Sequence, residues 1–273
     1  TPLFIMRYKI IFFYKAFVKK LINKTNLTII MHPYKGKFII IDGLDGIGKG
    51  VIISTLKSKE KNIFDLIEFL KLNKIYPNYK LLKKYKVIIS SEPTYTEKGL
   101  KIRQNIIRND SDYSALQTAK AYSEDRYELY KKIILPALRD GKTIIQDRSV
   151  CSSLVYQTTQ SEDKLSMEDL LKLKGNKLAL KNAPNLLIIP TINNPEELIT
   201  RLSKRKKKDN CIFENIKFQL KLKPVYESKE LKQLFQKQGT EVIYLDAGIS
   251  IKETENQAIK IYKDFISKQK SVS

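Results

Sequence analysis

The sequence contains a single histidine, no tryptophan and only two cysteines. Cys151 and Cys211 are too few for a disulfide framework and show no metal-ligand spacing, which favours a reducing, intracellular setting. The histidine, His32, precedes the predicted domain, so a histidine base or a histidine-rich metal site is disfavoured. Catalysis would therefore depend on lysine, arginine, aspartate, backbone amides and a bound cation.

Acidic residues are also scarce. The chain has 29 Asp and Glu against 51 Lys and Arg, a formal net charge of +22. Such a charge attracts phosphates, nucleotides, nucleic acid or anionic membranes and does not choose among them. Because the basic residues are spread along the chain, a general compositional bias explains them equally well. The 273 residues are 42% hydrophobic, enough for one α/β domain with extensions.

Residues 1–35 form a basic, apolar N-terminal extension without acidic residues. Lysines interrupt its apolar runs before they reach the ~20 residues that a membrane-spanning helix needs. A flexible basic tail, or upstream sequence ahead of a start at Met31, is favoured over an amphipathic sorting or membrane-surface helix. We therefore expect a cytoplasmic protein, with organellar targeting by this extension as the alternative.

Residues 36–273 alternate short apolar stretches with helix-length segments, a pattern typical of α/β proteins. Helices are expected from Ser114 to Leu138 and from Pro195 to Lys204, and the long 59–86 segment is expected to add a helix to the first crossover. The pattern predicts a five-stranded parallel sheet with helices on both faces. Together with the glycine-rich segment described next, it corresponds to a P-loop NTPase fold. The expected strands are Phe38–Ile41, Val87–Ile89, Thr143–Ile145, Leu186–Ile189 and Val242–Leu245.

A glycine-rich segment directly after the first expected strand satisfies the pattern G-x-x-x-x-G-K. Its backbone N–H groups would surround phosphate oxygens, and its lysine would face the β- and γ-phosphates of ATP. Glycine occupies the last position, where a Ser or Thr hydroxyl usually binds Mg²⁺, so either a water replaces the hydroxyl or phosphoryl transfer is slow. An incidental Gly-rich turn is the alternative. The segment reads Gly43-Leu44-Asp45-Gly46-Ile47-Gly48-Lys49-Gly50.

Further landmarks follow the P-loop in a specific order. They are Ser91-Glu92-Pro93-Thr94, the Tyr122–Arg126 helix, Leu135–Leu138, Asp147-Arg148, Tyr156-Gln157, Ala183–Leu186, the basic Arg201–Lys208 segment and Leu245-Asp246-Ala247. Each is weak alone. Their order and spacing resemble the thymidylate kinases, which are P-loop nucleoside monophosphate kinases, over nearly all of Lys37–Lys268.

This resemblance implies roles at the phosphate end of the site. Arg148 would bind the acceptor phosphate through two parallel hydrogen bonds. Asp147 would hold a Mg²⁺ ion through water or orient Arg148, and Asp45 would face the sugar or phosphate of the acceptor. A structural ion pair at the strand end and a backbone cap are the respective alternatives. The expected catalytic set is Lys49, Arg148, Asp45, Arg201 and Arg205.

The resemblance also implies an acceptor-base site. Tyr122 and Arg126 share a helix face and would stack on and hydrogen-bond the base, although a core tyrosine beside a surface arginine would give the same spacing. Glu92, Pro93, Arg103 and Gln157 are expected beside the acceptor, and Ala247 beside the adenine of ATP. Ser91 stands where an arginine is frequent in bacterial members of the family.

A short basic lid is expected from the charge run before Asp209. Arg201 and Arg205 are the expected lid cations, which would stabilise charge on the transferring phosphoryl group and exclude water. The neighbouring Lys206–Lys208 run has a solvated surface as its alternative reading. Asn210 replaces an arginine that often follows the aspartate.

The sequence thus predicts a phosphotransferase that uses ATP and Mg²⁺ to convert a deoxynucleoside monophosphate, dTMP, to its diphosphate. The alternatives are a kinase for another pyrimidine nucleotide or a nucleotide-binding relative with weak or no catalysis. A homodimer is expected from the resemblance. A dedicated nucleic-acid partner is not predicted.

Overall fold

The computed structural model describes residues 33–108, 111–160, 165–203, 213 and 215–270. Parallel strands form one sheet in the order β2-β3-β4-β1-β5-β6. All five expected strands are present, which confirms the parallel α/β fold. The sequence predicted five strands and the sheet has six. The additional strand, β2, is a three-residue edge strand without a recognisable apolar run. The strands are β1 Lys37–Ile41, β2 Ile63–Asp65, β3 Val87–Ser91, β4 Thr143–Asp147, β5 Leu186–Thr191 and β6 Glu241–Asp246.

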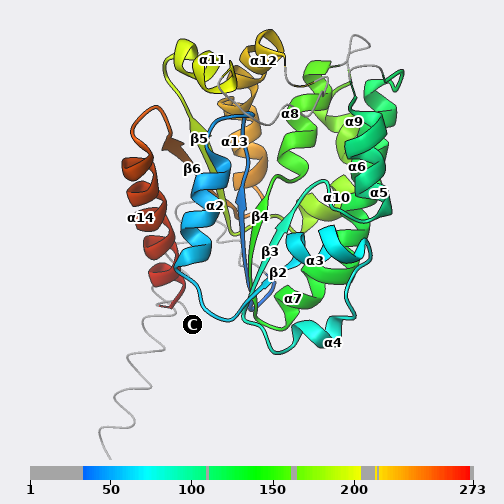
Figure 1. Cartoon of the computed structure of the whole chain (residues 1–273), viewed down its shortest axis with the longest axis vertical. Coiled ribbons are helices and arrows are strands. Elements are labelled where there is room, and N and C mark those ends of the chain that lie inside the picture. The colour runs from blue at the N-terminus through cyan, green and yellow to red at the C-terminus, as the bar shows by residue number, and fades with distance from the viewer. Residues whose placement is uncertain (1–32, 109–110, 161–164, 204–212, 214, 271–273) are drawn as a thin grey trace, which may run out of the picture. The chain divides into compact units, whose positions relative to one another are not determined.

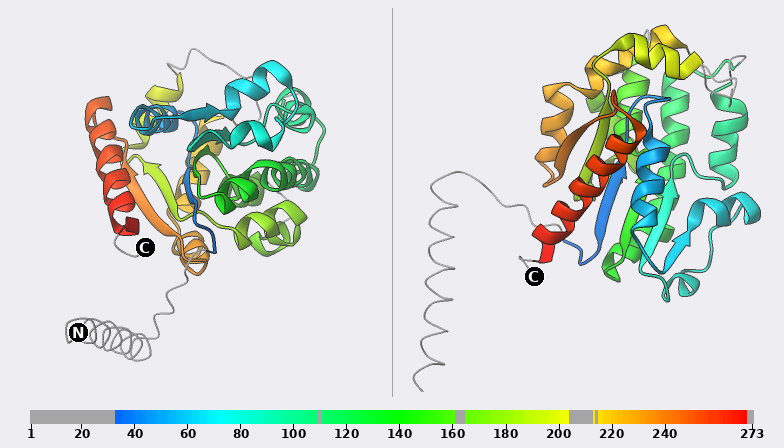
Figure 2. Two further views of the ribbon diagram at one scale, coloured as in Figure 1. Left: turned by 90° about the horizontal axis from the view of Figure 1, so that it is seen from below. Right: turned by 60° about the vertical axis from the view of Figure 1, so that its left-hand side comes forward.

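Helices cover both faces of the sheet. The described helices are α2 Lys49–Ser58, α3 Leu66–Asn73, α4 Tyr79–Leu82, α5 Glu97–Lys101, η1 Ile102–Ile106, α6 Ala115–Leu129, η2 Tyr130–Ile134, α7 Leu135–Arg139, α8 Val150–Gln160, α9 Met167–Lys172, α10 Lys174–Lys181, α11 Pro195–Ser203, α12 Ile216–Tyr226, α13 Lys229–Gln236 and α14 Ile251–Lys270. The α2 and α14 helices lie side by side on one face (Figure 1). The views in Figure 2 show α6, α7 and α8 on the opposite side of the strands.

The 59–86 segment contributes more than the single expected helix. It contains β2, α3 and α4. Asp65 links the strand to α3, since its carboxylate accepts the Glu68 N–H as an N-cap and pairs with Lys57 at 2.6 Å. The insertion therefore extends the sheet by one edge strand and packs α3 against β3.

The helix expected from Ser114 to Leu138 is present as a continuous run of α6, η2 and α7. Ser114 and Gln117 form a capping box at its start, which satisfies the first free N–H groups. The segment η2 is a π-helix of five residues that precedes Pro136 at the start of α7. The helix expected from Pro195 is α11, which ends at Ser203.

Within the described residues, no helix has the length and apolar character needed to cross a membrane. Residues 1–32, which make up most of the N-terminal extension, lie outside the described part of the chain. The expectations for that extension therefore stay predictions. Arg205, Lys206–Lys208, Asp209 and Asn210 also lie outside it.

Candidate functional site

The glycine-rich segment forms a loop between β1 and the N-terminus of α2. Gly46 and Gly48 have φ values of 71° and 101°, which glycine adopts without steric penalty. Lys49 Nζ folds back onto the loop and donates to the carbonyl oxygens of Gly43 at 3.1 Å and Leu44 at 2.6 Å. Burial, reinforced by the nearby positive charge of Arg148, lowers the pKa of Lys49 to about 8. A phosphate bound here would restore the charged form.

Asp147 ends β4 beside this loop, in register with Ile41 on one neighbouring strand and Ser91 on the other. Its Oδ1 atom is buried and has no hydrogen-bond partner among the described residues. Burial raises the pKa of Asp147, while the charge of Lys49 opposes this effect. An orphaned carboxylate oxygen fits a hydrated Mg²⁺ ion, which proteins often hold through one or two carboxylates plus substrate phosphates. Clusters of three or more metal-binding side chains are absent from the described residues.

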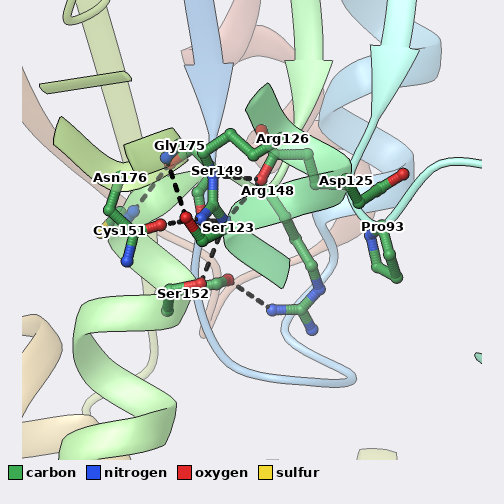
Figure 3. Close-up of polar contacts among 12 residues, drawn as sticks. Pro93, Ser123, Asp125, Arg126, Arg148, Ser149, Cys151, Ser152, Gly175 and Asn176 are labelled. Atoms are coloured by element: carbon green, nitrogen blue, oxygen red, sulfur yellow. Dashed lines mark hydrogen bonds and ion pairs between the residues drawn. The ribbon is translucent and has the colours of Figure 1, made fainter. Parts of the chain in front are cut away.

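Arg148 has a backbone φ of 66°, a left-handed conformation that is uncommon for residues other than glycine. Its guanidinium forms an ion pair with Asp45, donates to Ser152 Oγ at 2.8 Å and lies 5.2 Å from the centre of the Tyr156 ring. Figure 3 shows the Arg148 side chain reaching Ser152. The arginine is therefore held in place on the P-loop side of the cleft.

Gln219, on α12, is a site residue that the sequence analysis missed. It is fully buried, accepts the Asp45 backbone N–H at 2.9 Å and donates to the Asp45 carboxylate at 3.1 Å. A third bond, at 2.8 Å, runs to the carbonyl oxygen of Phe213. Asp45 and Gln219 are 174 positions apart, so no local sequence signal connects them.

Asp42 is a second missed residue. Directly after β1, it is fully buried and accepts hydrogen bonds from Ser149, Ser152 and Tyr226 at 2.6–3.1 Å. Ser152 also accepts from Arg148, so Asp42 supports the arginine through one intermediate hydroxyl. Its position at the carboxyl end of a central strand was the available signal.

Arg126 is buried rather than exposed, which rules out the surface-arginine alternative. Its Nε donates to Glu92 Oε2 at 2.8 Å, and Nη2 lies 2.7 Å from the same oxygen. Gln146 donates to the other Glu92 oxygen at 3.1 Å. Burial raises the pKa of Glu92 to about 7, although Arg126 opposes the shift. In its ionised form, Glu92 therefore pairs with the arginine charge before any ligand binds.

The loop after β3 is fixed by two charged side chains. The carboxylate of Asp125 accepts both the backbone N–H and the hydroxyl of Thr94. Arg103 donates to the carbonyl oxygens of Pro93 and Thr94, and its guanidinium lies 4.2 Å from the Tyr95 ring centre. Arg103 therefore lines the cleft with part of its hydrogen-bond donor capacity used by this loop.

One cleft of about 910 Å³ joins these groups. Its lining includes residues at or just after the carboxyl ends of β1, β3 and β4, where ligands bind in open α/β sheets. Gln157, 2% exposed, lines it and leaves its amide oxygen without a partner among the described residues. The expected site residues lining the cleft are Asp45, Gly46, Gly48, Lys49, Gly50, Glu92, Pro93, Arg103, Tyr122, Arg126, Asp147, Arg148, Gln157 and Arg201.

Four expected nucleotide-binding residues do not line this cleft: Gly43, Leu44, Ile47 and Ala247. Gly43 and Leu44 contribute carbonyl groups to Lys49, as described above. Ala247 is buried and donates its N–H to Thr191, so its side chain is enclosed in the protein. Arg201 does reach the cleft, but its guanidinium pairs with Glu197 and also donates to the Ile249 carbonyl at 3.4 Å.

The geometry of the cleft agrees with the similarity of this chain to known proteins. A family model for thymidylate kinase matches residues 72–258. A thymidylate kinase of Caldicellulosiruptor saccharolyticus is 30% identical over 236 residues, which cover 86% of this chain and 100% of that relative. The chain belongs to the thymidylate kinase family. This confirms the resemblance inferred from the ordered motifs.

Other members of the thymidylate kinase family extend the match. A thymidylate kinase of Prochlorococcus marinus is 34% identical over 187 residues, covering 67% of this chain and 78% of that relative. The structure of thymidylate kinase from Candida albicans aligns with a TM-score of 0.55 and 21% identity, covering 86% of this chain and 93% of that one. The latter match supports the fold alone.

Two residues that depart from the thymidylate kinase family pattern lie at the cleft. Gly50, in the first turn of α2, and Ser91, the last residue of β3, both line the cavity. Both departures from the family pattern therefore lie at the cleft and not on a distant surface.

Proposed function

We propose that this protein transfers the γ-phosphoryl group of ATP to dTMP and releases ADP and dTDP. The observation that carries the proposal is the convergence of two kinds of group in one cleft. Lys49 and Arg148 are suited to phosphates, while Arg126 and Gln157 are suited to a base. Family membership supports the same reaction.

The proposed choice of base follows from hydrogen-bond polarity. Arg126 can only donate, and the Gln157 amide oxygen accepts. A 4-oxo pyrimidine such as thymine matches this pair, since its 4-oxo group accepts and its N3–H donates. Cytosine offers the opposite pattern, an amino group and an unprotonated N3. Tyr122, on the same helix as Arg126, supplies an aromatic face for stacking.

The proposed mechanism is positioning with charge neutralisation, because phosphoryl transfer needs little covalent chemistry from the protein. Lys49 and the P-loop amides would hold the donor phosphates, and Arg148 would hold the acceptor phosphate in line with them. Asp147 would hold Mg²⁺ through water, and the bound ion would neutralise charge on the donor phosphates. The cleft would exclude water from the reacting groups. A protein general base is not required.

A coupled ADP-release assay tests the proposal. The protein with ATP and Mg²⁺ is offered dTMP, dUMP, UMP and dCMP in turn, and the products are identified by chromatography. We expect turnover with dTMP to exceed that with dCMP by more than 100-fold, because mismatched buried hydrogen-bonding groups are strongly rejected. The Candida albicans enzyme is described as having broad substrate specificity, so dUMP and UMP belong in the panel. ATP binding without turnover on any acceptor would refute the proposal.

Gly50 provides a test of the alternative, a nucleotide-binding relative with weak catalysis. A Cβ atom added at this position would meet no atom of the described residues within 4 Å, apart from its own helix and chain neighbours, so the first side-chain atom of a threonine has room. We expect Gly50→Thr to raise kcat by roughly 10-fold at limiting Mg²⁺, because the added hydroxyl can join the ion's ligands. The Mg²⁺ dependence of kcat measures the effect.

Gly50→Ala is the matched control, since it adds the Cβ without the hydroxyl. It is expected to leave the Mg²⁺ dependence unchanged. Equal rates for the glycine, alanine and threonine proteins at every Mg²⁺ concentration would show that this position does not limit the reaction.

A further inference from the structure

The α6 and α10 helices approach each other so closely that Gly175 has no room for a side chain. A Cβ atom at Gly175 would lie 1.8 Å from the carbonyl oxygen of Ser123. The Gly175 N–H instead donates to Ser123 Oγ at 2.8 Å, a contact drawn in Figure 3. The start of α10 is therefore held in one register against α6, the helix that carries Arg126.

The next residue, Asn176, is fully buried and uses both ends of its side-chain amide. Its Oδ1 accepts a hydrogen bond from Arg126 Nη1, and its Nδ2 donates to the Leu170 carbonyl oxygen at 2.9 Å. The second bond fixes which end of the amide faces the guanidinium, because a flipped amide would oppose donor to donor and acceptor to acceptor.

These contacts determine what Arg126 can offer to a ligand. A guanidinium has five N–H donors. The Nε donor and one Nη2 hydrogen face Glu92, Nη2 also reaches Ser149 O at 3.2 Å and Ser153 Oγ at 3.0 Å, and Asn176 takes one Nη1 hydrogen. Among the described residues, Asn176 is the hydrogen-bond partner of Nη1, and the second Nη1 hydrogen has no partner there. Arg126 is among the residues that line the cleft, so a ligand bound there lies next to this guanidinium.

We infer that Asn176 is a positioning residue that determines base specificity. By taking one Nη1 hydrogen, it orients the guanidinium so that the other meets the 4-oxo group of a pyrimidine. The inference rests on the proposed function. It assigns part of the choice between 4-oxo and 4-amino acceptors to α10, a helix whose Asn176 does not itself line the cleft.

Asn182 offers a matched control at the end of the same helix. It is also a buried asparagine with both amide ends bound: Nδ2 donates to Leu178 O at 2.7 Å, and Oδ1 accepts from Tyr34 at 2.5 Å. It does not contact Arg126 and does not line the cleft. Loss of either asparagine removes comparable packing and hydrogen bonds, and only one of them affects the guanidinium.

The experiment compares wild type, Asn176→Ala, Asn176→Asp and Asn182→Ala with dTMP and dCMP. For Asn176→Ala we expect the KM for dTMP to rise about 10-fold and the preference for dTMP over dCMP to fall by a similar factor, since a hydrogen bond to a charged group is lost. The KM for ATP is expected to stay within twofold. Asn182→Ala is expected to lower the melting temperature and leave the preference intact.

Asn176→Asp separates orientation from packing. It keeps an acceptor for Arg126 but loses the donor to Leu170, so it is expected to melt at a lower temperature and to retain more of the dTMP preference than the alanine variant. The inference is overturned if both Asn176 variants keep the wild-type preference, or if Asn182→Ala changes it equally.

Direct binding of dTMP and dCMP, measured by calorimetry without ATP, distinguishes failure of the proposed reaction from failure of the inference about Asn176. Wild-type protein that binds dTMP selectively without turnover would refute the proposed reaction, and the affinity ratios of the variants would still decide the role of Asn176. Absence of selective dTMP binding would overturn both.

Discussion

Replacing Lys49 with alanine is expected to lower kcat by about 10²–10³-fold, the effect typical of losing a preorganised charge at a transition state. The Lys49 ammonium is buried and already directed into the P-loop by the carbonyls of Gly43 and Leu44. The melting temperature is expected not to fall, because burial of this charge is unfavourable in the free protein, as its lowered pKa indicates. Single-turnover kinetics and thermal melts measure the two effects.

The pH dependence provides the control for Lys49. Its pKa is about 8 in the free protein, below the usual 10.5, so the neutral form predominates above pH 8. ATP binding requires the charged form and must then take up a proton, so the affinity for ATP is expected to weaken as the pH rises above about 8. Lys49→Arg stays charged and is expected to show no such decline. A decline of the same size in that variant would assign the titration to another group.

The sheet was predictable because its central strands are continuous apolar runs that can only be buried. The strand Phe38–Ile41 and its partners follow this rule, and their burial agrees with it. The strand β2 escaped prediction because Ile63–Asp65 is too short to show any period. Hydrogen bonding to Val87–Ile89 defines it, and that pairing depends on tertiary structure.

Site residues that belong to short sequence motifs were predictable, because the motif itself indicates their chemistry. The P-loop and the Asp147-Arg148 pair belong to this class, and the pair lines one cleft with five of the eight P-loop residues, Asp45, Gly46, Gly48, Lys49 and Gly50. The supporting residues Gln219 and Asn176 were not predictable, because they act on partners far away in the sequence. Asp42 had only its position at the carboxyl end of a central strand as a signal. A buried glutamine on a helix has no pattern that distinguishes it from a surface glutamine.

Arg148→Ala is expected to lower kcat/KM for dTMP by about 100-fold, because the acceptor phosphate loses a two-pronged, charge-assisted contact. The present geometry already places this guanidinium between Asp45 and Ser152 and against the Tyr156 ring. Arg148→Lys restores the charge without the planar fork, so it is expected to recover only part of the loss. Steady-state kinetics with varied dTMP at saturating ATP measures both variants.

Arg148→Gly separates the backbone of this residue from its side chain. The φ of 66° is strained for alanine and relaxed for glycine, so the glycine variant should exceed the alanine variant in unfolding free energy by about 1 kcal/mol, the reverse of the usual order. Both should be equally impaired in catalysis, since neither has a guanidinium. Equal stability of the two variants would mean that the left-handed backbone relaxes once the arginine is removed. Near-wild-type turnover in either would exclude Arg148 as the acceptor-phosphate ligand and make Arg103, which lines the same cleft, the next residue to test.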